Sequence, residues 1–334
     1  MKKTISIVLA LVMILSLFAG CGQTEKPAAT TPDTSAPSAD APSDDVVVLR
    51  TCTQNPETSI TTIVTRYFAK RVEEISEGKM KIDVYINAEF GSEQSVMEQV
   101  MTGTLEMAPI STSVLANVVP EVGIYSLPFL FPNMEVYASV TGDPAFQEVV
   151  FGAIQDQTGV VCLGGIQATG RGVSNTKHPV KTVDDLKGLK IRTIGSSAIN
   201  DSFEAMGATT TAVAWKEVYT ALQQGLCDGE DSTVNANLSM KFIEYTKYFT
   251  ELNEIFQDLL VIVNGSVWAG LTPEQQAFAE EHHGLILDFM EKHSLDDDYY
   301  GLLAQRYLKV VVRYLTEEEL RKYSFSTVVW YHLR

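Results

Sequence analysis

Cysteine, histidine and positive charge are scarce in this chain of 334 residues. Four cysteines are too few for a disulfide scaffold at this length. Against 42 aspartate and glutamate residues stand only 25 lysine and arginine residues, a net charge of −17 at pH 7, so the chain repels nucleic acid and anionic lipid headgroups. Beyond the N-terminus no long apolar run occurs, which excludes a protein with several membrane spans. We therefore expect no nucleic-acid partner.

The motifs of common enzyme classes are also missing. GxSxG, GxxxxGK[ST] and HExxH do not occur, so no nucleophile elbow, phosphate loop or zinc helix is predicted. His282 and His283 are adjacent, point about 100° apart on a helix and cannot hold one metal from one face. The acids near Gly225 and Gly229 lack the spacing of an EF-hand. We expect no enzyme activity, no cofactor and no metal site.

The first 45 residues indicate export rather than a fold. Two lysines precede the apolar run Ile5–Phe18, which is short for a membrane span of roughly 20 residues but typical of a signal peptide. Ala19 and Gly20 precede Cys21 as in the lipobox of bacterial lipoproteins, so we expect cleavage after residue 20 and a lipid on Cys21. An ordinary cleaved signal is the alternative. Residues 21–45 lack large apolar side chains and predict a disordered tether, which holds the body outside the membrane.

From residue 46 onward, strand patterns alternate with helix patterns. Val46–Thr53 and Met80–Ile86 predict strands, and the apolar face of Ser59–Ser76 predicts a helix between them. Asp143-Pro144 and Thr272-Pro273 are typical helix starts, and the second helix is expected to reach about residue 309. Such alternation predicts α/β layers with mixed sheets.

The same alternation continues in the second part of the chain. Leu189–Thr193 and Leu226–Asp228 predict strands, and Ser232–Phe242 predicts a helix. The cysteines of the body have no CxxC spacing and are expected in strands as buried, inert thiols: Cys52, Cys162 and Cys227.

Two blocks of sequence carry a family resemblance. They are D-L-K-G-L-K-I-R, which ends at Arg192, and E-V-Y-T-A-L-Q-Q-G, which ends at Gly225. Together with the G-R-G-V-S-N run at Gly170 and the L-P-F-L-F run at Leu127, their order resembles the DctP-type extracytoplasmic solute-binding proteins of TRAP (tripartite ATP-independent periplasmic) transporters. The resemblance covers about residues 46–271.

The resemblance implies a two-lobe, periplasmic-binding-protein-like α/β fold with a hinge and a long lobe-spanning helix. Lobe I would comprise residues 46–168 with about 258–297, and lobe II residues 169–257 with about 298–334. Family members continue into another helix where this chain ends in the short apolar segment 324–334. A native end and a truncated chain both remain open.

The resemblance also implies a ligand cleft for organic acids. The carboxylate-clamping arginine of the family falls on Arg192, a second arginine on Arg171 and the aromatic floor on Trp215. The D-G-x-E-N run of the family falls on residues 228–232, so Asp231 replaces its glutamate and Ser232 its asparagine, with Glu230 between the glycine and Asp231. In lobe I, positions that contact hydroxyl or amine groups in some members fall on Gln54, Glu93 and Ser111.

The chemistry of these residues agrees with carboxylate binding. A guanidinium presents a planar fork that meets both carboxylate oxygens, and Arg192 ends an apolar strand, where open α/β sheets place ligands. The structural alternatives are an Arg192 paired with Glu230 or Asp231, a purely structural Arg171, a Trp215 buried in the core, a Ser232 that caps a helix, and a Glu93 that only complements a helix dipole. The acids around one arginine favour a monocarboxylate with hydroxyl or amine groups, such as a sugar acid, over a dicarboxylate.

We therefore expect a lipid-anchored binding protein on the outer face of the cell membrane or in the periplasm. It would capture an organic acid and deliver it to a TRAP membrane permease. The alternatives are a binding protein of an ATP-binding-cassette importer or receptor, and a secreted enzyme that acts on the same acids.

Overall fold

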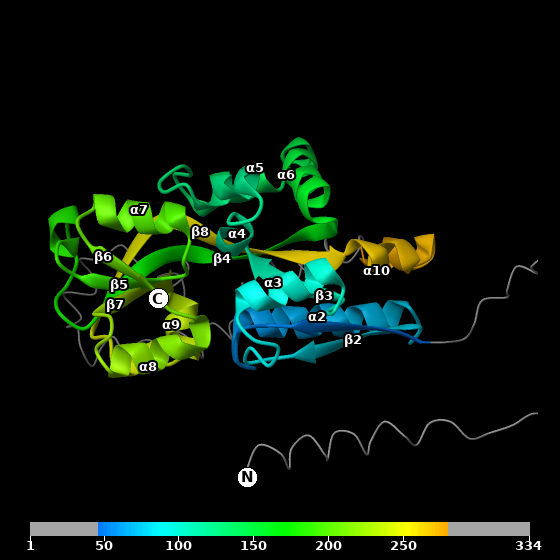
Figure 1. The fold of residues 1–334 in the computed structure, drawn as a ribbon, viewed down its shortest axis with the longest axis horizontal. Helices are drawn as coiled ribbons and strands as arrows, with labels where there is room; N and C mark the ends of the chain where they lie inside the picture. Colours follow the sequence, from blue (N-terminus) through cyan, green and yellow to red (C-terminus); the bar gives the residue numbers. More distant parts are fainter. Residues whose placement is uncertain (1–45, 280–334) are drawn as a thin grey trace, which may run out of the picture. The chain divides into compact units, whose positions relative to one another are not determined.

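The computed structural model describes residues 46–279, apart from the side chains of residues 167–169 and 257. They belong to Asp44–Arg334, one of two compact units of the chain. The strands are β1 (Val47–Cys52), β2 (Met80–Tyr85), β3 (Met107–Ser111), β4 (Val160–Asn175), β5 (Lys190–Thr193), β6 (Thr209–Ala212), β7 (Gly229–Thr233) and β8 (Tyr248–Asn264) (Figure 1).

Short helices connect most of these strands. The α-helices are α2 (Ile60–Ile75), α3 (Glu93–Thr102), α4 (Thr112–Leu115), α5 (Met134–Thr141), α6 (Pro144–Thr158), α7 (Ser197–Ala205), α8 (Val218–Gln223), α9 (Val234–Ser239) and α10 (Gly265–Gly270). The 3₁₀ helices are η1 (Pro120–Ser126), η2 (Val183–Leu186), η3 (Trp215–Glu217) and η4 (Phe242–Glu244). Within residues 46–279, no helix has the length and apolar character that a membrane crossing requires.

In the described part of the chain, eight strands form one mixed sheet in the order β2-β1-β3-β8-β4-β7-β5-β6. β1 is parallel to β2 and β3, and β5 is parallel to β6 and β7. The long strands β4 and β8 are antiparallel to each other and join the two parallel groups (Figure 1). The expected α/β class with mixed strand directions is confirmed.

Helices cover both faces of the sheet. Successive apolar side chains of β8 point to opposite faces, so each face needs a covering layer. Leu260 and Ile262 pack into a core with residues of α3, η1 and α6, whereas Leu259 and Val261 pack into a second core with α2. Accordingly, α5 and α6 lie on the opposite side of the sheet from α2 (Figure 1). Beyond β4, α7 and α8 have separate cores of their own.

The predicted helix starts are confirmed. Asp143 Oδ1 accepts hydrogen bonds from the backbone N–H groups of residues 145 and 146, which caps α6. Thr272 and Gln275 form a reciprocal capping box, and residues 273–279 are helical. The remainder of the helix expected to reach residue 309 lies outside the described residues.

Two expectations near residue 230 are wrong. The strand begins at Gly229 rather than spanning Leu226–Asp228, and the helix begins at Val234 rather than at Ser232. The polar run 230–232 continues as a strand because it pairs with residues 172–174 of β4. Thr233, not Ser232, caps the helix by accepting a hydrogen bond from the N–H of Ala236.

All three cysteines of the described residues are free thiols. Cys52 and Cys227 are buried and Cys162 is partly buried, and burial raises the pKa of each thiol, that of Cys227 to about 11. Such thiols stay protonated at neutral pH and are poor nucleophiles. Cys52 and Cys162 lie in strands as expected, whereas Cys227 precedes β7.

Candidate functional site

A polar cavity lies where the carboxyl ends of β1, β3, β5 and β7 meet the starts of α2, α3 and α9. Strand ends of this kind are where open α/β sheets place ligands, and the N-terminal ends of helices favour negative charge. The cavity is lined by Gln54, Asn55, Ser59, Ile60, Thr61, Glu93, Pro109, Ser111, Arg171, Arg192, Ile194, Trp215, Ser232, Thr233, Asn235, Ala236 and Leu259.

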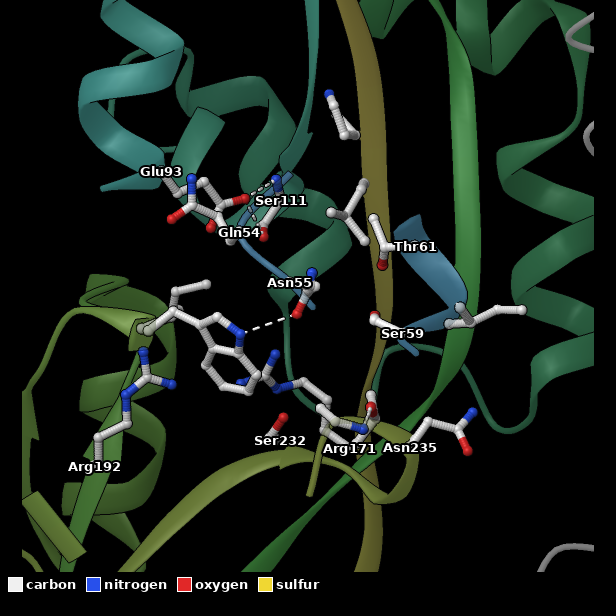
Figure 2. A pocket seen from close by; sticks show the side chains of 17 residues that line it. Gln54, Asn55, Ser59, Thr61, Glu93, Ser111, Arg171, Arg192, Ser232 and Asn235 are labelled. Atoms are coloured by element: carbon white, nitrogen blue, oxygen red, sulfur yellow. Dashed lines mark hydrogen bonds between the residues drawn. The ribbon is translucent and has the colours of Figure 1, made fainter. Parts of the chain in front are cut away.

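Seven of the nine candidate residues line this cavity, although they are distant in sequence. Figure 2 shows Gln54, Glu93 and Ser111 together on one side and Arg171, Arg192 and Ser232 on the other. Trp215 also lines it, whereas Glu230 and Asp231 do not. Apart from Arg171, which lies on β4, the two sides come from the two parallel strand groups and their connections, so the cavity lies between the parts of the sheet that β4 and β8 join.

Arg171 is held by an internal ion pair. It lies on β4, is 3% exposed, and its Nη2 is 2.7 Å from a carboxylate oxygen of Asp231. Its Nε also donates to this carboxylate, and its Nη2 donates to the Asp231 carbonyl. The aspartate raises the pKa of Arg171 against the opposing effect of burial. Gly170 and Gly172 flank the arginine because a Cβ at either position would overlap β8.

Arg192 is buried without such a pair. It lies on β5, is 1% exposed, and its Nε and Nη2 donate to one neutral acceptor, the Val213 carbonyl, at 3.0 and 2.7 Å. Within the described residues, its Nη1 makes no hydrogen bond and the side chain forms no ion pair. Burial lowers the pKa of Arg192 to about 10, with the charge of Glu230 opposing this shift and that of Arg171 adding to it, and the guanidinium remains charged at neutral pH.

Trp215 connects the two sides of the cavity. Its ring lies 5.2 Å from the guanidinium carbon of Arg192, within the range of a cation–π interaction. Its indole N–H donates to Asn55 Oδ1 at 2.9 Å, across the cavity (Figure 2). One edge packs against Phe242, so Trp215 both borders the cavity and contacts the core beside α8.

The opposite wall carries a carboxylate. Glu93 begins α3, and its Oε1 accepts hydrogen bonds from the Ser111 N–H and Oγ, both at 2.6 Å. Burial raises the pKa of Glu93, against the hydrogen bonds from Ser111 and the charges of both arginines. Its Oε2 has no partner in residues 46–279 and can accept from a ligand. Gln54 is anchored beside it by a 3.3 Å bond to the Gly91 carbonyl.

Glu230 and Asp231 lie behind the wall that carries the arginines. Asp231 is fully buried against Arg171. Glu230 is also fully buried and accepts from Ser174 Oγ and Asn237 Nδ2 at 3.0 and 2.6 Å. Burial raises the pKa of Glu230 to about 7, although the charge of Arg192 opposes this. Neither acid presents its side chain to a solute in this cavity.

Sequence reasoning missed several polar lining residues, among them Asn55, Ser59, Thr61 and Asn235. Asn55 follows the end of β1, and Ser59 and Thr61 lie at the start of α2. The available signal was the strand end itself, because polar residues directly after a buried strand face such a cavity.

The groups that line the cavity can bind a polar anion. Residues 46–279 contain no cluster of histidine, cysteine, aspartate or glutamate that could hold a metal ion. The cavity offers guanidinium donors on one wall, and carboxylate, amide and hydroxyl groups on the other. This combination fits a small anion that also carries hydroxyl or amine groups.

The family model described as bacterial extracellular solute-binding protein, family 7 (DctP), matches residues 52–324. A solute-binding protein of Verminephrobacter eiseniae is 34% identical over 214 residues, which are 64% of this chain and 63% of the relative. The chain thus spans somewhat less than two thirds of that relative's length.

Solved structures resemble this chain over most of their length. A TRAP periplasmic solute-binding protein of a Bradyrhizobium species, in complex with D-galacturonate, is 28% identical with a TM-score of 0.71 and covers 79% of this chain and 86% of its own. One from Sulfurospirillum deleyianum, with bound succinate, is 25% identical with a TM-score of 0.72 and covers 82% and 90%. These likenesses confirm the expected two-lobed α/β fold.

Proposed function

Because the chain belongs to the bacterial extracellular solute-binding proteins of family 7, we propose that it captures an organic acid outside the cytoplasm and delivers it to a TRAP-type transporter. One observation carries this proposal. Arg192 is a buried cation with no ion pair among the described residues, and it borders a cavity with polar groups on both walls. A ligand carboxylate would complete the hydrogen bonds of Nη1 and compensate the charge.

We propose a monocarboxylate with hydroxyl groups, such as a sugar acid, as the preferred class. The carboxylate would contact Arg192, and Glu93 Oε2 would accept from a hydroxyl or an ammonium group on the far side. A dicarboxylate would place its second carboxylate beside the Glu93 carboxylate, which lines the same cavity, and the two like charges would disfavour binding. The galacturonate bound by the Bradyrhizobium relative supports this class, and the succinate of the Sulfurospirillum relative represents the competing one.

The lobes and the membrane attachment complete the proposal. Lobe I would comprise residues 46–168 with 258–297, and lobe II residues 169–257 with 298–334, and they would close over the solute. Cys21 would carry the lipid anchor, so Cys21→Ser should abolish labelling with a radioactive fatty acid and release the protein from membranes. No bond of the solute would be made or broken.

A melting-temperature panel tests the proposal. A ligand at 100 times its dissociation constant stabilises a protein by about 2.7 kcal/mol, so D-galacturonate should raise the melting temperature of residues 22–334 more than succinate does. Arg192→Gln should abolish the rise. The matched control, Arg66→Gln, removes an exposed arginine of α2 that does not line the cavity and should keep it. A chain that responds to no organic acid, or one that converts the acid to a product, contradicts the proposal.

A further inference from the structure

The segment between β2 and Arg171 has an unusual charge composition. Residues 82–170 contain ten aspartate and glutamate residues but no lysine, arginine or histidine. Five of the acids are exposed on η1, α5, α6 and their connections: Glu121, Glu135, Asp143, Glu148 and Asp156. Within the described residues, these five exposed acids have no ion-pair partner.

The same segment exposes apolar side chains. Of the eleven large apolar residues that are exposed in the described part of the chain, seven lie between residues 118 and 149. Three of them, Leu127, Phe129 and Leu130, are in the loop after η1, and others lie on α5 and α6. We call the exposed side chains of residues 118–156 the acidic apolar face. Exposed apolar side chains that are concentrated in one segment together with exposed acids are candidates for an interaction site.

The loop presents Phe129 in a fixed position. Phe129 is 62% exposed, whereas Phe131, two residues later, is 9% exposed and packs edge-on against Tyr137. The backbone of Phe129 has φ of +59°, a left-handed conformation that is a strained outlier for a bulky residue. Its N–H donates to the Glu254 carbonyl of β8 at 2.7 Å, which holds the loop against the sheet. An aromatic side chain held outward in this way is typical of an interface anchor.

The exposed acids and apolar side chains of this face indicate which kind of partner could bind it. An anionic lipid surface would be repelled by the five exposed acids, and no cation of residues 82–170 offsets them. A protein surface with apolar side chains surrounded by lysine and arginine is complementary in both respects. We propose that the acidic apolar face is the docking surface for such a basic-rimmed partner protein. The inference rests on the proposed function for the identity of that partner, the membrane subunits of the transporter.

The test measures binding of residues 22–334, which contain the whole unit Asp44–Arg334, to a TRAP permease of the same organism held in nanodiscs. The triple variant Leu127→Ser, Phe129→Asn, Leu130→Ser removes the apolar anchors, and asparagine tolerates the left-handed conformation. We expect at least tenfold weaker binding. The matched control Val183→Ser, Leu226→Ser removes exposed apolar residues outside the face and should bind like the wild type.

The charge component has its own variant. Glu148→Lys with Asp156→Lys on α6 should weaken binding several-fold and reduce its dependence on salt. Asp184→Lys with Asp201→Lys, exposed acids outside the face, is the matched control. All variants should bind the organic acid with a dissociation constant within twofold of the wild type, since none of these residues lines the cavity.

Several outcomes would overturn the inference. The triple variant could bind the permease as tightly as the wild type does. The wild type could bind equally well to nanodiscs that lack the permease. The chain could also self-associate through these residues, so that the triple variant abolishes the self-association. A wild-type chain that binds an organic acid but not the permease also overturns it and leaves solute capture intact. A wild-type chain that binds the permease but no organic acid contradicts the proposed capture instead.

Discussion

The surroundings of Arg171 and Arg192 differ although both arginines line one cavity and are almost completely buried. Arg171 meets the carboxylate of Asp231, an internal partner of opposite charge. Arg192 donates hydrogen bonds to a neutral carbonyl and lies over the face of Trp215, and the nearby charge of Glu230 acts on it without an ion pair among the described residues. Burial alone therefore does not identify a binding arginine. The informative difference is whether the protein supplies an ion-paired carboxylate or leaves that position to a ligand.

The pKa values of the two arginines shift in opposite directions, as expected for one arginine with an ion pair and one without. Asp231 raises the pKa of Arg171, whereas burial lowers that of Arg192 to about 10. A bound carboxylate would stabilise the charged form of Arg192, as Asp231 does for Arg171. We therefore propose that Arg171 mainly supports the cavity wall and that Arg192 recognises the ligand.

Removing the counter-charge of Arg171 should have the largest effect. Asp231→Ala leaves a buried guanidinium without its ion-pair partner, which typically costs about 3–5 kcal/mol of unfolding free energy. Denaturant unfolding of the two proteins gives the difference directly. A loss below about 1 kcal/mol would mean that Asp231 is not the main partner of Arg171.

Glu230, the buried acid behind Arg192, should make the unfolding free energy depend on pH. Burial raises the pKa of Glu230 from 4.5 to about 7, so the folded state favours the protonated form. Its contribution to stability is then complete below about pH 4.5 and is lost as the pH rises through 7, on the order of 3 kcal/mol. Unfolding free energies measured from pH 5 to 8 should fall, and Glu230→Gln should flatten part of that fall. An unchanged slope in the variant contradicts this assignment.

The bond between Trp215 and Asn55 should matter less. Trp215→Phe keeps an aromatic ring over Arg192 but removes the N–H donor, which is worth about 1 kcal/mol. Affinity for the organic acid should fall by about fivefold, because this bond joins the two walls. A double-mutant cycle with Asn55→Ala isolates the interaction. A coupling energy near zero would show that the contact does not hold the walls together.

The smallest effect on stability is expected at Arg192 itself. Arg192→Gln removes a buried charge that has no ion pair in the described residues. The substitution loses packing contacts, but folding no longer has to remove a charged group from water, and the two effects on the unfolding free energy offset each other. The unfolding free energy without ligand should change by no more than about 1 kcal/mol, in contrast to Asp231→Ala. A destabilisation as large as that of Asp231→Ala would make Arg192 a structural residue like Arg171.

Much of the site could be predicted from the sequence, because several of its residues lie at the ends of strands and helices that local sequence patterns mark. The strand that carries Arg192 and the N-terminal residue Glu93 of α3 follow from apolar runs and helix caps. The strand β8 was not predicted, because Glu254 and Asp258 interrupt its apolar pattern. Both acids are nevertheless buried, and burial raises their pKa values, that of Asp258 to about 7.

The partner of Arg171 could not be read from the sequence either. Asp231 is 60 residues away, and its contact depends on the register that pairs β4 with β7. That register also places Glu230 and Asp231 behind the cavity wall. Local patterns specify elements, whereas the pairing of distant strands decides which of several acids meets which arginine.

A crystal structure with bound D-galacturonate tests the central claim most directly. We expect Nη1 of Arg192 to donate to the ligand carboxylate at about 2.7–2.9 Å, while Arg171 remains paired with Asp231. A carboxylate bound by Arg171 with Asp231 displaced, and an Arg192 that still contacts only the Val213 carbonyl, would contradict it.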